Sequence, residues 1–537
     1  MIKKALLLFF LLPMSVAVLG QRRYMVFFKD KHGSGYSLAE PSEFLSERAI
    51  LRRDKQGIGL EERDLPVSAV YTDQLKNIGY QPEWKTKWLN GVLVRGSKED
   101  SLQIATLPFV KSVEYVSPVF GSDLAKREAE TQEDEPIPEV TQGQRGMMEA
   151  QKFAQRDFHG QGIMVAVFDG GFVGAETSLA FGHLWAEGKI KATRNYIEPS
   201  RSVFRYSSHG SEVLSCLAGQ TTDGEFIGTA PGADVILCVT EDDRAYEYEH
   251  RIEEYNWLFA AEYADSLGVD IISSSLGYYE FEDRSMDYRP DDLGKGVAVI
   301  SKAAKLAFER GMLVVTSAGN EGNGSWRYVT FPAGEPEVLA VGAIDDFWER
   351  ASFSSIGYEG TPDRIKPDLV ALGAGVQTFG KGDSPVAKNG TSYSAPLVAG
   401  FAACVWEKNP GWPASKLLEE LRESGHRQAT PDLELGYGVP QASYFLSDED
   451  DEFVMSILSN PVTDGVITFR FTGGDPDTQF RYWLYDLSGR LVKDYGFQTL
   501  NPYGKLQLPL PKGTPKGIYL LRVESKFKKG TFRILVE

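Results

Sequence analysis

The chain has 537 residues, a formal net charge of −18 and 42% hydrophobic residues, a composition typical of globular proteins with more than one core. This acidic balance argues against a nucleic-acid binder, because neutralising phosphates requires a basic face. Cys216, Cys238 and Cys404 lie in apolar runs without the paired spacing of a zinc site, so we expect buried thiols and no disulfide framework.

The first twenty residues predict a signal peptide. Lys3 and Lys4 precede an apolar run over residues 5–12, and small residues lead to a cut before Gln21. An uncleaved anchor is the alternative, but the run is short for a membrane span. We therefore expect an exported, soluble protein.

Residues 21–118 predict a small α+β domain. Strands are expected at 24–28, 91–95 and 109–116, and a charged amphipathic helix at 41–53. Residues 119–142 follow as an acidic, proline-bearing stretch with few large apolar side chains. Such a composition is typical of an exposed linker that proteases can cut.

Residues 143–446 predict an α/β domain, because strands alternate with helices along the chain. The expected strands are 163–168, 234–239, 269–273, 313–316 and 338–342, and the expected helices are 251–266 and 295–310. This alternation favours a parallel sheet with helices on both faces. Binding and chemistry in such sheets collect at the carboxyl ends of the strands.

Residues 453–537 predict a small β-sandwich. They follow a second acidic hinge at 447–452 and contain short alternating strands separated by turn signals. The expected strands are 466–471, 480–485, 505–510, 517–522 and 530–536.

Ser392 lies between Thr391 and a long apolar run of helical period. A serine in the first turn of a helix is either an N-cap or a nucleophile. Serine and threonine are common N-caps, so Ser392 alone does not decide between the two interpretations.

A nucleophilic serine needs a base and a carboxylate that orients the base. His209 stands at the start of an apolar helix, beside Gly210, and Asp169 ends a strand before a glycine turn. Asn320 follows a buried strand and could donate its amide to an oxyanion. A structural histidine, a turn aspartate and a turn asparagine are the ordinary alternatives.

The order Asp169, His209, Asn320, Ser392 resembles that of the subtilisin-like serine peptidases, the S8 or subtilase family. The stretches 274–277, 351–355 and 366–371 resemble further blocks of this family, so the resemblance covers nearly all of residues 143–446. It implies a parallel-sheet subtilisin-like catalytic domain, in which Asp169, His209 and Ser392 form the triad. It also implies that Asn320 and the backbone amide of Ser392 form the oxyanion hole.

The same resemblance implies that Ser275, Leu276 and Gly277 line the substrate cleft, where an extended peptide would pair by main-chain hydrogen bonds. Two positions depart from the family pattern. Tyr393 stands where the family usually has methionine, and Glu212 where it usually has histidine or a small residue. Neither departure removes a catalytic group.

The flanking segments resemble accessory parts of such proteases. Residues 21–118 are similar to the inhibitory propeptide of these enzymes in Bacteroidetes, and residues 453–537 to the C-terminal sorting domain read by the type IX secretion system. The implied partners are protein or peptide substrates, the chain's own propeptide and the type IX machinery. The implied destination is the cell surface or the medium, reached through the periplasm. A carbohydrate-binding or adhesive β-sandwich is the alternative for the tail.

The sequence therefore predicts a secreted serine endopeptidase made as a zymogen. The alternative is a catalytically silent surface or binding protein on the same fold. The resemblance makes calcium binding possible, because members of this family can bind calcium. No loop carries regularly spaced acidic ligands, so we name no metal site and no cofactor.

Overall fold

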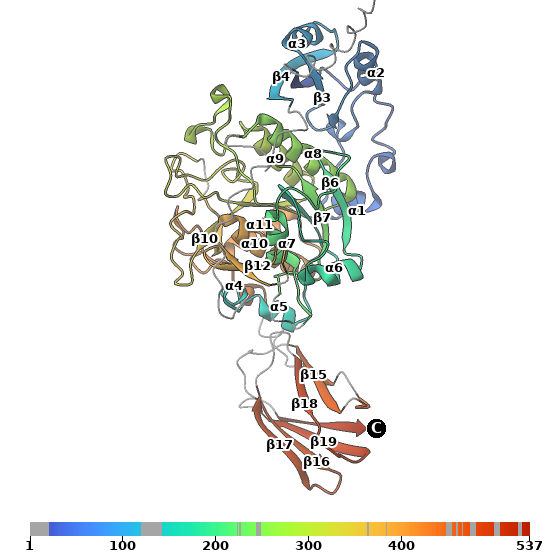
Figure 1. Cartoon of the computed structure of the whole chain (residues 1–537), viewed down its shortest axis with the longest axis vertical. Coiled ribbons are helices and arrows are strands. Elements are labelled where there is room, and N and C mark those ends of the chain that lie inside the picture. The colour runs from blue at the N-terminus through green and yellow to red at the C-terminus, as the bar shows by residue number, and fades with distance from the viewer. Residues whose placement is uncertain are drawn as a thin grey trace, which may run out of the picture.

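The computed structural model describes residues 21–119, 142–222, 224, 227–242, 249–361, 365–382, 384–446, 454–457, 460–463, 465–472, 480–498, 505–524 and 529–537. The expected signal peptide, nearly all of the acidic linker and the hinge before the tail lie outside these residues. No helix within the described part is long and apolar enough to cross a membrane. Figure 1 shows the N-terminal elements at one end of the molecule and the C-terminal strands at the other.

The N-terminal segment contains a four-stranded antiparallel sheet of order β2-β3-β1-β4. Its elements are β1 (Arg22–Phe28), α1 (Glu47–Gln56), α2 (Ala69–Asn77), β2 (Trp84–Thr86), β3 (Gly91–Gly96), α3 (Lys98–Ala105) and β4 (Val110–Pro118). The helix expected over 41–53 is wrong at its start. Ser46 accepts a hydrogen bond from the backbone N–H of Ala49 and caps α1, while Pro41–Glu43 form a separate 3₁₀ turn.

A seven-stranded parallel sheet forms the centre of the molecule, in the order β11-β10-β9-β8-β5-β7-β6. Its strands are β5 (Met164–Asp169), β6 (Ile190–Asn195), β7 (Asp234–Val239), β8 (Ile271–Ser274), β9 (Leu313–Ser317), β10 (Val338–Ile344) and β11 (Leu369–Leu372). The expected α/β class with a parallel sheet is confirmed. The edge strands β6 and β11 were not predicted, and β6 carries Lys191 and Arg194, which interrupt its apolar pattern.

Helices cover both faces of this sheet, because successive side chains of β5 point to opposite faces and are buried on both. Val165 and Val167 belong to one core with α7 (His209–Ala218), α10 (Thr391–Lys408) and α11 (Ala414–Glu423). Ala166 and Phe168 belong to the other core with α8 (Arg251–Leu267) and α9 (Val299–Glu309).

The helix expected from 295 begins only at Val299, because Gly294 and Gly296 adopt left-handed conformations before it. The remaining short helices of this part are α4 (Gln142–Gly146), α5 (Gln151–Gln155), α6 (Gly182–Ala186) and α12 (Ala442–Phe445), and β12 (Val376–Thr378) pairs with β13 (Val386–Lys388).

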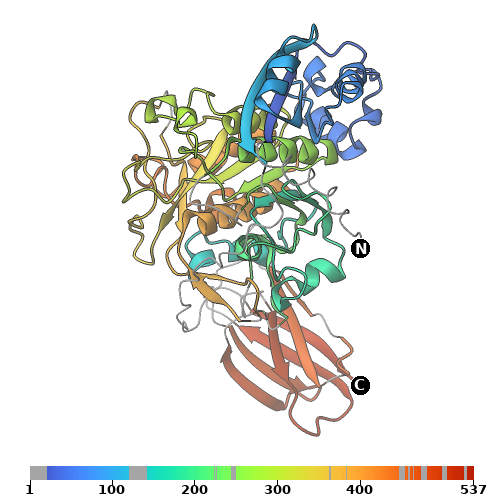
Figure 2. The ribbon, with the colours of Figure 1, turned by 45° about the horizontal axis from the view of Figure 1, so that its top comes forward.

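The N-terminal sheet packs on the second of these faces. Met25, Trp88, Leu93 and Val116 join the core formed by α8 and α9, whereas alternate residues of β1 such as Val26 face the segment's own helices. Figure 2 shows the blue sheet lying against the green helix α8. The N-terminal segment is therefore docked on the helical back of the central sheet.

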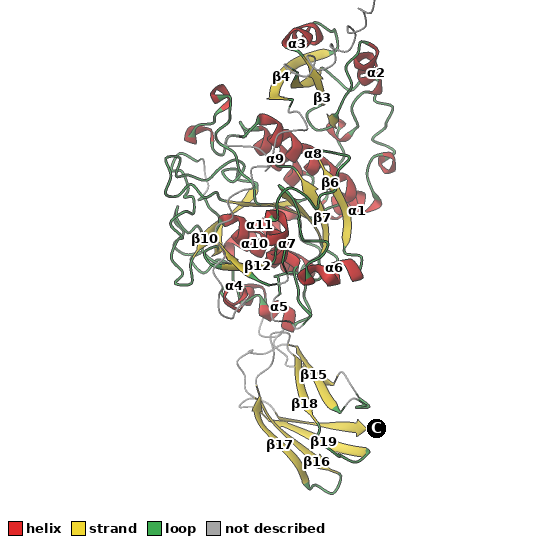
Figure 3. Ribbon diagram, in the orientation of Figure 1, coloured by secondary structure: helices red, strands yellow, loops and turns green. Residues whose placement is uncertain are grey.

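The C-terminal part is built of strands, as Figure 3 shows. One antiparallel sheet has the order β14-β15-β18 and the other the order β17-β16-β19-β20, and side chains from both share one core. The strands are β14 (Val454–Ile457), β15 (Val466–Thr472), β16 (Phe480–Asp486), β17 (Leu491–Gln498), β18 (Lys505–Pro509), β19 (Gly517–Glu524) and β20 (Lys529–Val536). The expected sandwich of antiparallel strands is confirmed, and β14 and β17 are additions to it.

A buried ion cluster ties the end of the sheet to α11. The carboxylate of Asp368 accepts from Nζ of Lys366 at 2.8 Å and from Nε of Arg422 at 2.6 Å. It also accepts from the backbone N–H of Ala340 on β10. Burial lowers the pKa of Lys366 to about 8, although Asp368 opposes this effect.

We predict that Asp368→Asn destabilises the fold by about 3–5 kcal/mol, because two buried cations lose their counter-charge. Urea denaturation followed by tryptophan fluorescence measures this change. The control is Lys305→Gln, which removes an ion pair whose lysine is 49% exposed and should cost less than about 1 kcal/mol. Equal denaturation midpoints for the two variants would contradict the prediction.

Candidate active site

A cleft of about 420 Å³ opens at the carboxyl ends of the central strands. Asp169 ends β5, Ser275 follows β8, and Asn320 lies three residues beyond β9. His209 and Ser392 reach the cleft from the first turns of α7 and α10. All seven candidate residues line this one cleft: Asp169, His209, Ser275, Leu276, Gly277, Asn320 and Ser392.

Asp169 and His209 form a hydrogen-bonded pair. Nδ1 of His209 lies 2.9 Å from Oδ1 and 3.0 Å from Oδ2 of Asp169, whose side chain is fully buried. The backbone N–H of Gly170 also donates to Oδ1, at 2.8 Å. A Cβ at Gly210 would lie 2.4 Å from the carbonyl oxygen of Gly171, so a glycine is needed here for the helix to approach the strand end.

Ser392 is not the N-cap of its helix. Gly390 occupies that position, with a φ of 155° and no side-chain capping bond, and Ser392 is the second helical residue. The interpretation of Ser392 as a cap is therefore wrong. Its hydroxyl is not committed to the backbone of the first turn, so it can take part in chemistry.

Pro396 explains a further contact of Ser392. Proline has no N–H, so it cannot donate to the carbonyl oxygen four residues earlier in the helix. That oxygen belongs to Ser392, and the hydroxyl of Ser275 donates to it at 2.8 Å. Ser275 thus replaces the missing helical bond and joins the segment after β8 to the start of α10.

Asn320 is oriented by Thr391. Its Oδ1 accepts from the backbone N–H of Thr391 at 2.9 Å and from the hydroxyl of Thr391 at 3.0 Å. The amide nitrogen Nδ2 is thereby turned to the other side. Thr391 was not singled out in the sequence, although its place between Gly390 and Ser392 was a usable signal.

One wall of the cleft is acidic. Carboxylate oxygens of Glu241, Glu249 and Glu253 lie within 4.8 Å of one another, a donor set of the kind that hard cations such as Ca²⁺ use. The sequence did not indicate this group, because its members follow β7 and enter α8 without regular spacing. The hydroxyl of Tyr278 donates to Glu241. Burial, and then the charges of Glu253 and Glu249, raise the pKa of Glu241 well above its usual value.

A family model described as "Subtilase family" matches residues 160–438, just over half of the chain. The chain belongs to the subtilase family. A second model, "Peptidase S8 propeptide domain, Bacteroidota", matches residues 23–134 of this subtilase.

Known relatives align with about half of the chain. The subtilase is 28% identical over 270 residues to subtilisin NAT of Bacillus subtilis subsp. natto, an alignment that spans 50% of the chain and 61% of the relative. It is 27% identical over 270 residues to a subtilisin of Bacillus pumilus, spanning 50% of the chain and 85% of the relative. The solved MycP3 protease from the type VII (ESX-3) secretion system aligns with a TM-score of 0.46 and 22% identity, over 58% of this chain and 89% of that one.

The three cysteines are buried and free, as expected from their apolar surroundings. Burial raises the pKa of the Cys238 thiol to about 12. The thiol therefore stays protonated at neutral pH and is no alternative nucleophile.

We predict that Glu241→Gln stabilises the protein increasingly as the pH rises from 5 to 8. In the unfolded chain Glu241 ionises near its ordinary pKa of about 4.5, whereas the folded state keeps the proton to higher pH. Folding therefore loses free energy as the pH rises from the unfolded pKa towards the folded one, and glutamine avoids this loss. Thermal unfolding in a Ser392→Ala background measures it, and parallel Tm curves for the two proteins would contradict it.

Proposed function

We propose that this subtilase is a serine endopeptidase that hydrolyses peptide bonds through an acyl-enzyme. The observation that carries the proposal is the Asp169–His209 pair in one cleft with Ser392. His209 would take the proton of the Ser392 hydroxyl through Nε2 while Oγ attacks the peptide carbonyl. The same proton would then pass to the leaving amine, and water would hydrolyse the ester. Asp169 would hold the imidazole in the tautomer that this requires.

Asn320 and the start of α10 would stabilise the oxyanion. Thr391 occupies Oδ1 of Asn320, which leaves Nδ2 as the free donor of that amide. The backbone N–H of Ser392 lies in the first turn of α10, where N–H groups have no helical partner and the helix dipole favours negative charge. Two such donors act on the charge that develops in the transition state.

The substrate would be an extended peptide or protein segment. Ser275, Leu276 and Gly277 continue from β8 along the cleft, and their backbone could pair with a peptide by main-chain hydrogen bonds. No specific observation favours the alternative of a catalytically silent binding protein.

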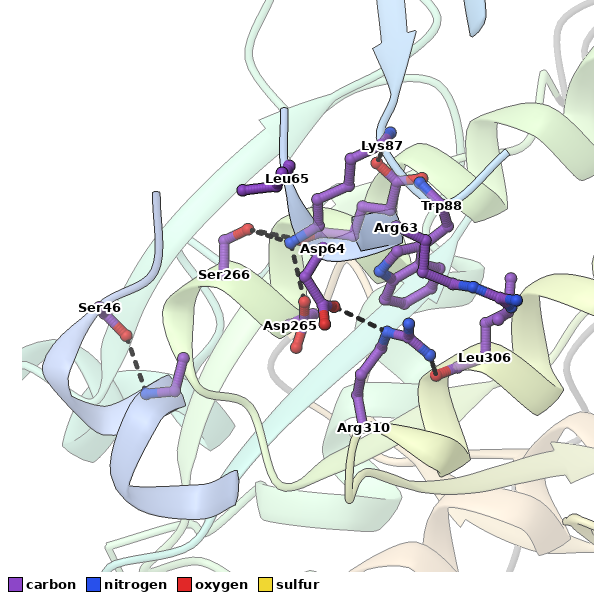
Figure 4. Close-up of polar contacts among 12 residues, drawn as sticks. Ser46, Arg63, Asp64, Leu65, Lys87, Trp88, Asp265, Ser266, Leu306 and Arg310 are labelled. Atoms are coloured by element: carbon purple, nitrogen blue, oxygen red, sulfur yellow. Dashed lines mark hydrogen bonds and ion pairs between the residues drawn. The ribbon is translucent and has the colours of Figure 1, made fainter. Parts of the chain in front are cut away.

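We propose further that the N-terminal segment is the propeptide that holds the zymogen together. Asp265 on α8 is fully buried and receives three cations from that segment, as Figure 4 shows in part. Nη2 of Arg52 lies 2.6 Å, Nη2 of Arg53 2.8 Å and Nζ of Lys87 2.8 Å from its carboxylate. Burial alone would raise the pKa of Asp265, but the three cations lower it far below its usual value.

Neighbouring contacts extend the same interface. The carboxylate of Glu262, one turn before Asp265, accepts the backbone N–H groups of Lys87 and Trp88 at 2.7 and 3.0 Å. In another ion pair the N-terminal segment supplies the carboxylate: Asp64 accepts from Nε of Arg310 at 3.1 Å. Apolar and ionic contacts thus combine to hold the N-terminal segment on α8 and α9.

The destination of the protein is part of the proposal. The lysines and apolar run at the start of the sequence support export, and the similarity of the tail to type IX sorting domains supports passage through the periplasm to the surface or the medium. The type IX machinery would be a partner of the two-sheet C-terminal part.

We predict that Ser392→Ala abolishes hydrolysis of peptide substrates, labelling by a fluorophosphonate probe and self-cleavage between residues 120 and 141. The reason is the loss of the attacking oxygen. Ser394→Ala is the matched control, because its buried hydroxyl on the same helix donates only to backbone carbonyls of β11. That variant should keep its activity. Self-processing of the pure Ser392→Ala protein would contradict the proposal.

We predict that Asp265→Asn weakens the attachment of the propeptide by about 100-fold or more, because three buried cations lose their counter-charge, a cost of about 3–5 kcal/mol. To measure this, an added protease cuts the Ser392→Ala chain within residues 120–141. Gel filtration at a series of protein concentrations then shows whether the two pieces still elute together. Asp54→Asn, an exposed change on α1, should leave co-elution unchanged. Equal retention of the pieces in both variants would refute the role of Asp265.

A further inference from the structure

The two positions at which the sequence departs from the subtilase pattern are in contact. The hydroxyl of Tyr393 donates a hydrogen bond of 2.8 Å to Oε2 of Glu212, and both side chains are buried. Tyr393 directly follows Ser392 in α10, and Glu212 lies three residues after His209 in α7. The bond therefore joins the helix that carries the serine to the helix that carries the histidine.

The second oxygen of Glu212 is held as well. Oε1 accepts from the hydroxyl of Ser208 at 3.2 Å, and Nζ of Lys388 lies 3.7 Å from it. Ser208 precedes His209, and Lys388 ends β13 just before α10. A Cβ at Gly380 would lie 3.0 Å from the Glu212 side chain, so this glycine leaves room for the carboxylate. The Glu212 carboxylate is thus held in place between the first turns of α7 and α10.

Tyr393 also packs beside the histidine. Its ring centroid lies 5.6 Å from that of His209, at an interplanar angle of 52°. Burial, and then the charge of Glu212, raise the pKa of Tyr393 well above its usual value, so the hydroxyl remains a donor at neutral pH. Among the described residues that line the cleft, neither Tyr393 nor Glu212 appears, which places both behind the reacting groups.

We propose that Tyr393 and Glu212 are positioning residues, whose hydrogen bond holds the first turns of α7 and α10 at the separation at which His209 takes the proton of Ser392. This role rests on the function proposed above. A misplacement of a reacting group by about 1 Å can cost roughly 100-fold in rate. Because neither side chain lines the cleft, loss of the bond acts on the chemical step and leaves substrate binding unchanged.

The decisive variant is Tyr393→Phe, which removes the hydroxyl and keeps the ring beside His209. We expect kcat for a peptide substrate to fall about tenfold and KM to change by less than about twofold. Here kcat is expressed per active site titrated with a fluorophosphonate. The rate constant of fluorophosphonate labelling should fall in proportion to kcat, since it also depends on proton removal from Ser392.

Changes at Glu212 test the bond from its other end. Glu212→Gln keeps an oxygen that accepts from Tyr393 and should retain kcat within about threefold. Glu212→Leu removes the acceptor and should lower kcat as far as Tyr393→Phe does. Because both changes remove one interaction, the double variant should be no slower than either single one.

Tyr288→Phe is the matched structural control. The hydroxyl of Tyr288 donates to Oε2 of Glu254 at 2.8 Å, and both residues are buried on the opposite face of the sheet. Its removal should lower Tm about as much as Tyr393→Phe does and leave kcat unchanged.

Two results would overturn the positioning role. One is a Tyr393→Phe enzyme with the kcat of the wild type and only a lowered Tm, and the other is a raised KM with an unchanged kcat. If the processed wild type neither hydrolyses peptides nor reacts with the fluorophosphonate, the proposed function itself fails. An active wild type with a fully active Tyr393→Phe variant refutes the positioning role alone.

Discussion

The hydrogen bonds between Asp169 and His209 set the strictest constraint on this structure. They require a buried carboxylate at the end of β5 and a histidine side chain within 3 Å of it, which this parallel sheet supplies because α7 begins close to the carboxyl end of β5. Gly210 is the consequence, because any side chain there would meet the backbone of the glycine turn after Asp169. The strand order follows the same logic: β5 lies between β7 and β8, so the segment with Ser275 lies next to the carboxylate.

Two buried carboxylates show how similar ionic clusters can serve different ends. Asp368 is neutralised by Lys366 and Arg422 and joins parts of one domain, whereas Asp265 is neutralised by cations of the N-terminal segment alone. Buried ions lose hydration that their mutual attraction only partly returns, and they regain it when they separate. An ionic interface is therefore specific in its alignment and less costly to open than an apolar one of equal area. That property suits the role of a removable propeptide that we propose for the N-terminal segment.

Apolar runs were enough to predict five of the seven strands of the central sheet, and the alternation of strands with helices was enough to predict the α/β class. The pattern missed the short buried strand β11, and it missed β6 and β17, whose exposed, charged positions break it. Local sequence also left Ser392 open as a cap, whereas the N-cap of α10 is Gly390. Other contacts join residues that are distant in the chain: Arg52 meets Asp265 213 residues later, and Ser275 meets Ser392 after 117. Such pairs are set by packing and not by spacing.

Pro396 shows that part of the missing information was nonetheless present. A proline four residues after Ser392 necessarily leaves that carbonyl without a helical donor, and a buried carbonyl must find another. The same requirement for a polar partner applies to the buried side chains of Tyr393 and Glu212. Taken singly, each is a departure from the family pattern with no stated consequence, but a buried carboxylate needs donors and a buried phenol needs an acceptor. The two departures satisfy each other, so they act together as one polar contact behind the serine and the histidine.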